Sequence, residues 1–193
     1  KLSGAFSAYY AYEYMAADHL LYLQYNVCAD VQAQSFTDFC MDMFENMDDL
    51  AIDTIVVDLR NNKGGNSEIF NAFTDEIDDY MRRNTGAALY IAIGRNTFSS
   101  GMFALLRIKK AVPEAIVIGE ATGCTVDGYG DTRSFILPNS QLPVTYSTKY
   151  FELSRQYNYM GDPVEYMPDI VVPVTIEDFC YGTDPLMDYM LVN

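Results

Sequence analysis

Two adjacent serines and a pair of glycines are the residues of this chain best suited, by type and spacing, to chemistry. Ser99 and Ser100 follow one apolar run, and Gly64 and Gly65 follow another. In open α/β sheets, reactive groups lie beyond the carboxyl ends of such strands. A serine at a helix start is a candidate nucleophile, because helix N-terminal amides stabilise nearby negative charge. Glycines allow a positive φ and close approach of a substrate carbonyl, so an amide of their turn is a candidate oxyanion-hole donor.

Each of these features also has an ordinary structural explanation. Serine is a favoured helix N-cap, and a Gly-Gly pair often does no more than close a tight turn. Asp58 and Arg60 stand at alternate positions where the first apolar run ends. A carboxylate and a guanidinium in this arrangement are predicted to form an internal ion pair or to anchor the turn, rather than to catalyse.

The elements that must position these groups alternate along the chain. Apolar, β-branched runs predict strands at 20–27, 54–59, 88–93 and 115–119. Three- and four-residue apolar spacing predicts helices from Ser35, over 66–83 and over 99–110. This alternation is typical of an α/β fold, in which a mostly parallel sheet is covered by helices.

The two ends of the chain follow other patterns. Short strands are predicted at 133–137, 142–147 and 170–172, separated by proline- and glycine-containing turns. In the segment 5–17, which is rich in alanine and tyrosine, the helix and strand patterns compete.

Composition limits the function classes. The 193 residues, half of them hydrophobic, suffice for one well-buried domain. Twenty-seven acidic against twelve basic residues give a net charge of −15, which would repel a nucleic acid backbone. No apolar run reaches the ~20 residues needed to span a bilayer, so we expect no membrane insertion by this chain. The four cysteines have no CxxC spacing and only one histidine to join them. We therefore expect buried thiols or one or two disulfides, and neither a metal nor a cofactor.

Four segments, in this order, resemble the S41 family of serine peptidases, the tail-specific or C-terminal processing peptidases. They are 58–65, 97–101, 118–123 and 167–172. The resemblance is strongest to the branch that includes tricorn and interphotoreceptor retinoid-binding protein. It implies a ClpP/crotonase-like β/α superhelical core with additional short strands in the C-terminal third. It also implies that residues 1–193 form a single S41-type catalytic domain, to which an upstream N-terminal region belongs in relatives.

The resemblance also assigns roles to residues. Ser100 matches the nucleophile, with Ser99 as the rival position. The glycine turn of Gly64 and Gly65, together with the amide of Gly101, matches the oxyanion hole. Gly101 stands where many relatives have glutamate.

The general base is the point at which this sequence departs from the better-known relatives. Thr125 stands where those relatives carry the catalytic lysine. The tricorn-like branch instead uses a histidine assisted by a later acid, and the resemblance places Asp162 nearest that acid, with Glu165 beside it. His19 is the only histidine of the chain and is therefore the candidate base, with Lys149 as another. A base supplied from an upstream region is the further alternative. We expect none of these residues to complete a triad with Ser100.

Two functions follow as hypotheses. The first is a serine peptidase that hydrolyses a peptide or protein substrate. The second is a non-catalytic S41-like binding module for peptides or apolar ligands, favoured by the missing lysine and the single histidine. The expected partners are a peptide or protein substrate and either an upstream domain or a second copy of the chain. The resemblance slightly favours an extracytoplasmic or secreted location.

Overall fold

The computed structural model describes residues 8–192 of the chain. The helical elements are α1 (Phe36–Met47), the 3-10 helix η2 (Ser67–Phe70), α2 (Asn71–Arg83), α3 (Ser100–Ala111), α4 (Leu153–Gln156), α5 (Ile176–Tyr181) and α6 (Pro185–Val192). The strands are β1 (Tyr10–Met15), β2 (Leu20–Tyr25), β3 (Thr54–Asp58), β4 (Ala88–Ile93), β5 (Ile116–Gly119), β6 (Gly128–Ile136), β7 (Pro143–Phe151) and β8 (Ile170–Val171).

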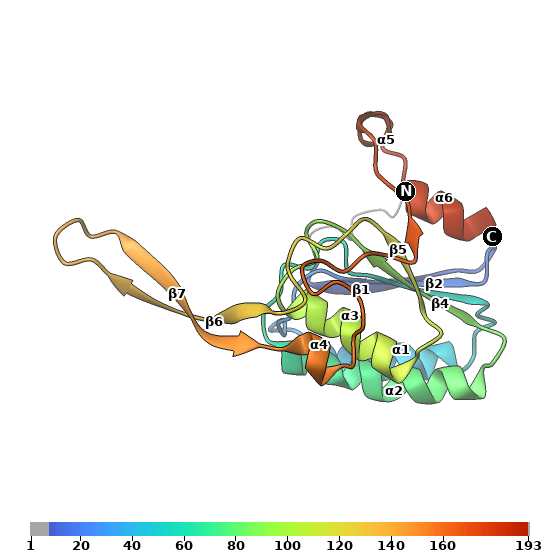
Figure 1. Ribbon diagram of the computed structural model, residues 1–193. Helices are drawn as coiled ribbons and strands as arrows, with labels where there is room; N and C mark the ends of the chain where they lie inside the picture. The colour runs from blue at the N-terminus through green and yellow to red at the C-terminus, as the bar shows by residue number, and fades with distance from the viewer. Residues whose placement is uncertain (1–7, 193) are drawn as a thin grey trace.

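Six strands form one sheet in the order β1-β2-β3-β4-β5-β8. β1 runs antiparallel to β2, and all the other neighbours are parallel. Figure 1 shows α1, α2 and α3 on one face of this sheet and α6 on the other. The predicted α/β class with a mostly parallel sheet is therefore confirmed.

The sheet is covered on both faces, which explains why its central strands read as continuous apolar runs. Every residue of β2 is buried. Leu21 and Leu23 belong to the larger core beneath α1, α2 and α3, whereas Leu20 and Tyr22 belong to the smaller core beneath α6. This alternation is the period of two expected for a strand.

The predicted helix starting at Ser35 is confirmed. The Ser35 side chain accepts a hydrogen bond from the Asp38 amide and caps α1. The predicted helix over 66–83 is divided into η2 and α2, with no break between them. In the described part of the segment 5–17, the strand pattern prevails over the helix pattern as β1, whereas residues 5–7 lie outside the described range.

The C-terminal third differs from the prediction of separate short strands. β6 and β7, nine residues each, pair with each other to form one long antiparallel hairpin. Figure 1 shows this hairpin projecting from the body of the molecule. We call residues 128–151 the arm.

Two further expectations concern composition. Within residues 8–192, no helix combines the length and hydropathy needed to cross a bilayer. All four cysteines are free thiols: Cys28 and Cys40 are buried, Cys124 is half-buried and Cys180 is exposed.

Candidate active site

The turn between β4 and α3 places the two serines in different environments. Ser99 is exposed and has φ 53° and ψ −119°, a backbone conformation in which a non-glycine residue is strained. Its side chain makes no capping hydrogen bond to α3. Among the described residues, no partner is found for its hydroxyl. The ordinary explanation of Ser99 as a helix cap therefore fails.

Ser100 is turned inward. It is 6% exposed, and its Oγ donates a hydrogen bond to the Gly65 carbonyl at 2.6 Å. This hydroxyl serves to tie the start of α3 to the glycine loop. Of the two hydroxyls, the one matched to the family nucleophile is the less accessible.

The glycine loop after β3 lies directly against Ser99. Gly64 and Gly65 have φ values of 101° and 133°, which side-chain-bearing residues rarely adopt. A Cβ added to Gly64 would lie 2.7 Å from the Cβ of Ser99. A Cβ on Gly65 would lie 2.3 Å from the carbonyl oxygen of Cys28. Both close approach and backbone conformation therefore require glycine at these two positions.

The amides around Ser99 divide into occupied and free donors. The Gly64 amide donates to Asn62 Oδ1 at 2.9 Å, and the Gly101 amide donates to the Phe98 carbonyl at 2.9 Å. Within residues 8–192, the amides of Gly65 and Ser100 have no acceptor. One free amide belongs to the residue after Ser99, and the other belongs to the glycine whose carbonyl accepts Ser100 Oγ. Two amides of the predicted oxyanion hole, those of Gly64 and Gly101, are already engaged.

Asn62 holds the glycine loop and was not assigned a role from the sequence. It is fully buried, donates through Nδ2 to the Tyr25 carbonyl at 2.8 Å and accepts the Gly64 amide through Oδ1. Its backbone carbonyl also accepts the Phe98 amide at 2.9 Å, which joins the loop to the serine turn. An amide side chain with both ends engaged in the core fixes the loop in one position.

Thr97, like Asn62, was not assigned a role from the sequence. It is fully buried, and its Oγ1 donates to the Leu59 carbonyl at 2.9 Å while accepting the Gly94 amide at 3.0 Å. Asn62 and Thr97 both lie inside the segments that carry the family resemblance. Their position was thus visible in the sequence, but their burial was not.

Asp58 and Arg60 form the predicted internal ion pair. The Arg60 guanidinium contacts Asp58 and also Asp184, with Nη2 at 2.7 Å and 2.8 Å from their carboxylates. Tyr22 donates its hydroxyl to Asp58. Burial disfavours the charged form of Asp184, but the hydrogen bonds from Arg60 prevail and hold the pKa of this carboxyl below its ordinary value. This network ties β2, β3 and the start of α6 together.

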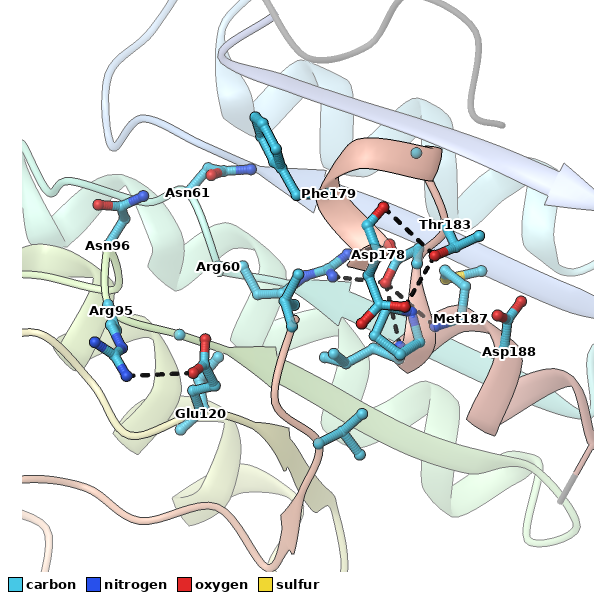
Figure 2. A pocket seen from close by; sticks show the side chains of 18 of the residues that line it. Arg60, Asn61, Arg95, Asn96, Glu120, Asp178, Phe179, Thr183, Met187 and Asp188 are labelled. Atoms are coloured by element: carbon cyan, nitrogen blue, oxygen red, sulfur yellow. Dashed lines mark hydrogen bonds and ion pairs between the residues drawn. The ribbon is translucent and has the colours of Figure 1, made fainter. Parts of the chain in front are cut away.

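A cavity of about 930 Å³ lies on the α6 side of these strand ends. Figure 2 shows Asn61 and Asn96 at one end of it, the Arg95–Glu120 contact below Asn96 at the same end, and, from α5, Phe179 above Arg60 and Asp178 beside it. Asn61 precedes the residue that holds the glycine loop, and Asn96 precedes Ser99 by three residues. The cavity lining thus comes within three residues of Ser99 in the sequence, but it includes neither the two serines nor Gly64 and Gly65.

His19 is far from both serines, so its assignment as the base is wrong. It precedes β2 and pairs through Nδ1 with Asp53, which precedes β3, at 3.0 Å. Ser99 and Ser100 follow β4, at the opposite end of the same parallel sheet. A strand of six residues spans roughly 20 Å, well beyond the reach of a general base.

The other acid and base candidates make no contact with either serine among the described residues. Asp162 is exposed and accepts the amide of Val164, and Glu165 is exposed in the same loop. Lys149 lies on the arm, with its Nζ 4.6 Å from the centre of the Phe151 ring. Thr125 is exposed beside Gly128. Within residues 8–192, none of these side chains is hydrogen-bonded to Ser100, whose Oγ is bonded to the Gly65 carbonyl.

A thiol that the sequence did not single out contacts the serine turn instead. Cys124 Sγ is 3.8 Å from the Thr97 carbonyl and hydrogen-bonds the backbone of Ser99. Burial raises the pKa of this thiol, so it stays protonated at neutral pH. It is therefore a neighbour of the site and not its base. Among the described residues, no three histidine, cysteine or acidic side chains are grouped as metal ligands would be.

Comparison with known proteins rests on the fold. No protein-family model and no curated protein matches the sequence. Among solved structures, a candidate peptidase from Parabacteroides merdae matches all of the chain with a TM-score of 0.66 at 17% identity. A candidate S41 protease from Bacteroides fragilis matches 89% of the chain with a TM-score of 0.57 at 15% identity.

This chain has an S41-like fold. The photosystem II D1 C-terminal processing protease also shares it, over 80% of the chain, with a TM-score of 0.50 at 12% identity. The chain spans 66% of the Parabacteroides protein, 53% of the Bacteroides protein and 42% of the D1 protease. The shared fold thus extends over most or all of this chain, whereas each of these three proteins also contains residues that the match does not cover. The resemblance to the tricorn branch stays a prediction.

Proposed function

We propose that this S41-like domain is a serine-type hydrolase of peptide bonds in which Ser99, rather than Ser100, is the nucleophile. The observation that carries the proposal is an exposed and strained Ser99 next to two free amides, that of the following residue, Ser100, and that of Gly65, whose carbonyl is bonded to Ser100. In acyl transfer, donors of this kind stabilise the oxyanion that develops on the attacked carbonyl. Backbone strain at a residue held in place by its surroundings is characteristic of functional sites.

Ser100 would contribute its backbone amide to the same reaction, and not its hydroxyl. Its hydroxyl would have to leave the Gly65 carbonyl and the core before attacking a substrate, whereas the Ser99 hydroxyl has no bond to break. If Ser99 attacks, the amide of the next residue faces the oxyanion, and that amide belongs to Ser100. Gly65 supplies the second donor. The proposal thus retains Gly65 from the sequence-based assignment and replaces Gly64 and Gly101 with the amide of Ser100.

The proposed reaction still needs a base to remove the Ser99 proton. None is within reach among residues 8–192, so the base is proposed to come from sequence outside that range or from another subunit. The chain by itself is then expected to carry the nucleophile and the oxyanion donors but to react slowly. A small diffusible base should partly replace the missing group.

The test uses a fluorophosphonate probe on the 193-residue chain, with and without added imidazole, and maps the labelled residue by mass spectrometry. We expect labelling at Ser99 that increases with imidazole. Ser99→Ala should abolish the labelling, while the matched variant Ser100→Ala, which keeps its amide, should retain it. Labelling at Ser100, or labelling of Ser99→Ala at the wild-type rate, would refute the assignment of the nucleophile.

A binding module is the second candidate function, and the absence of a base near Ser99 favours it. It predicts that a peptide ligand binds the wild type and Ser99→Ala with equal affinity. It also predicts no imidazole-dependent labelling at either serine. Turnover of a peptide by a longer chain that supplies the base would exclude it.

A further inference from the structure

The arm is the part of the molecule whose apolar surface is least covered. β6 and β7 pair closely with each other and have few contacts with other elements. Four aromatic side chains on the arm are about half or more exposed: Tyr129 (75%), Phe135 (50%), Tyr146 (48%) and Tyr150 (50%). A two-stranded hairpin is marginally stable by itself, so exposed rings on such a hairpin indicate a surface that packs against something else.

The pairing places these rings on one face of the arm. The register has the same numbering on both sides of Asp131, from Gly128 opposite Phe151 to Ile136 opposite Pro143, while Asp131 itself, with a φ of 53°, is not among the paired residues. With a period of two, the odd-numbered residues of β6 share a face with the even-numbered residues of β7. Tyr129 packs against Tyr150 with ring centres 4.9 Å apart, and Phe135 against Tyr146 at 6.1 Å. The opposite face is mostly glycine, serine and threonine.

The aromatic face is self-complementary about its middle. Thr132 pairs with Ser147 at the centre of the arm. Tyr129 and Phe135 lie three residues to either side of Thr132, and Asp131 and Arg133 lie one residue to either side. A two-fold axis through this point would place an aromatic ring over an aromatic ring, and each carboxylate over a guanidinium. Contacts in which residue i meets j and j meets i are what a two-fold interface requires.

Charge favours the arm as the place where two copies meet. The arm contains one acidic and two basic side chains, a net charge of +1, so the remainder of the chain carries −16. Two such bodies repel each other, and this repulsion is weakest where the contact lies away from them. Figure 1 shows the arm projecting well beyond the body.

We propose that the arm is a dimerisation element, through which two copies of this chain pack their aromatic faces across a two-fold axis near Thr132. Asp131 of each copy then faces Arg133 of the other. Strands of nine residues make a face roughly 30 Å long, and a two-stranded face of that length buries an area near the lower limit for specific interfaces, about 1,000 Å² in total. The dimer is accordingly weak, with a dissociation constant in the micromolar range.

The test is sedimentation velocity over a wide range of protein concentration, with two charge variants. Arg133→Asp leaves two acidic groups on the face, and Asp131→Lys leaves two basic groups. Each variant alone should dimerise about tenfold or more weakly than wild type, because like charges then meet across the axis. An equimolar mixture of the two should regain wild-type affinity as a heterodimer. Circular dichroism should show both variants folded, since both side chains are exposed.

Asp131 needs one control because its φ is 53°. Asparagine tolerates this left-handed conformation, so Asp131→Asn removes only the charge and should weaken the dimer less than Asp131→Lys. A wild-type chain that stays monomeric at every concentration would overturn the proposal. So would a mixture no tighter than its components. Stronger dimerisation by Asp131→Lys alone would also overturn it, and would indicate instead that the arm docks on the acidic body of a second copy.

Discussion

Two neighbouring regions at the carboxyl end of the sheet differ in how completely their polar groups are satisfied. In the Arg60 network, the guanidinium contacts both Asp58 and Asp184, and the Tyr22 hydroxyl donates a further hydrogen bond to the Asp58 carboxylate. At the serine turn, the hydroxyl of Ser99 and the amides beside it have no partners among the described residues, and the backbone is strained. The saturated region has the character of a scaffold, and the unsaturated one has the character of a site.

The two regions also depend on each other. Both regions use residues that directly follow β3. Arg60 is the cation of the network, and Asn62, two residues later, holds the glycine loop. Strain at Ser99 persists only if the surrounding structure holds it, and the buried Asn62 and Thr97 provide that hold. Substitutions in the Arg60 network should therefore lower the stability of the fold. Substitutions that relieve the backbone strain at Ser99 should raise it.

The largest effect is expected from Arg60→Met. It leaves the carboxylate of Asp58, whose side chain is 1% exposed, without its cation, and should lower the free energy of unfolding by about 3–5 kcal/mol. Chemical denaturation measures this change. The matched control is Arg95→Met, because the Arg95 side chain is 84% exposed with its Nη2 3.6 Å from Glu120; this variant should lose less than about 0.5 kcal/mol. Equal losses in the two variants would mean that the network is not a scaffold.

Gly64→Ala should have the next largest effect. The new Cβ would lie 2.7 Å from Ser99 Cβ at a φ of 101°, which combines a steric clash with backbone strain. We expect a loss of about 2–3 kcal/mol, measured by thermal or chemical unfolding. Gly86→Ala is the control, because nothing lies within 4 Å of the added Cβ. A neutral Gly64→Ala would show that the loop and the serine turn are not held against each other.

Much of the fold was predictable because buried strands and helix faces require apolar residues in recognisable patterns along the sequence. The parallel strands β2 to β5 are covered on both faces and read as apolar runs, and Ser35 capped α1 as its residue type indicates. The arm was harder to predict. Its exposed rings alternate with serine, threonine and glycine, and only pairing along its full length makes the short predicted strands into one hairpin.

The site was only partly predictable, for a reason that Ser99 and Ser100 illustrate. Their residue types are identical, and motif matching placed the nucleophile at Ser100. One strained φ at Ser99 decides which hydroxyl is exposed, and no sequence pattern here reports that angle. His19 was assigned because it is the only histidine, but the sheet topology places it at the opposite end of the strands.

A smaller effect should separate the two serines in stability. Ser99→Gly relieves the strain at φ 53° and, after the entropic cost of glycine in the unfolded chain, should stabilise the fold by about 1 kcal/mol. Ser100→Ala removes the hydrogen bond to the Gly65 carbonyl and should destabilise it by about 1 kcal/mol. Opposite signs in denaturation experiments would support the division between strained site and supporting scaffold. If both variants destabilise equally, Ser99 is a structural residue like its neighbour.

The smallest expected effect is the pH dependence of the Arg60–Asp184 pair. Because the pKa of Asp184 is lower in the folded chain than its ordinary value of 3.8, the contribution of the ionised carboxylate to stability is present in full above that value. It is lost as the pH falls through the lower folded pKa, when the carboxylate takes up a proton. Asp184→Asn should therefore be less stable than wild type by up to about 1 kcal/mol near neutral pH, since the pair is partly exposed. Urea titrations from about pH 5 to pH 2 should show this difference narrowing. Asp188→Asn, an exposed position on the same helix with no ion pair among the described residues, is the control and should leave stability near neutral pH within about 0.5 kcal/mol of wild type. A constant difference for Asp184→Asn would mean that its carboxylate contributes packing and capping of α6 rather than charge.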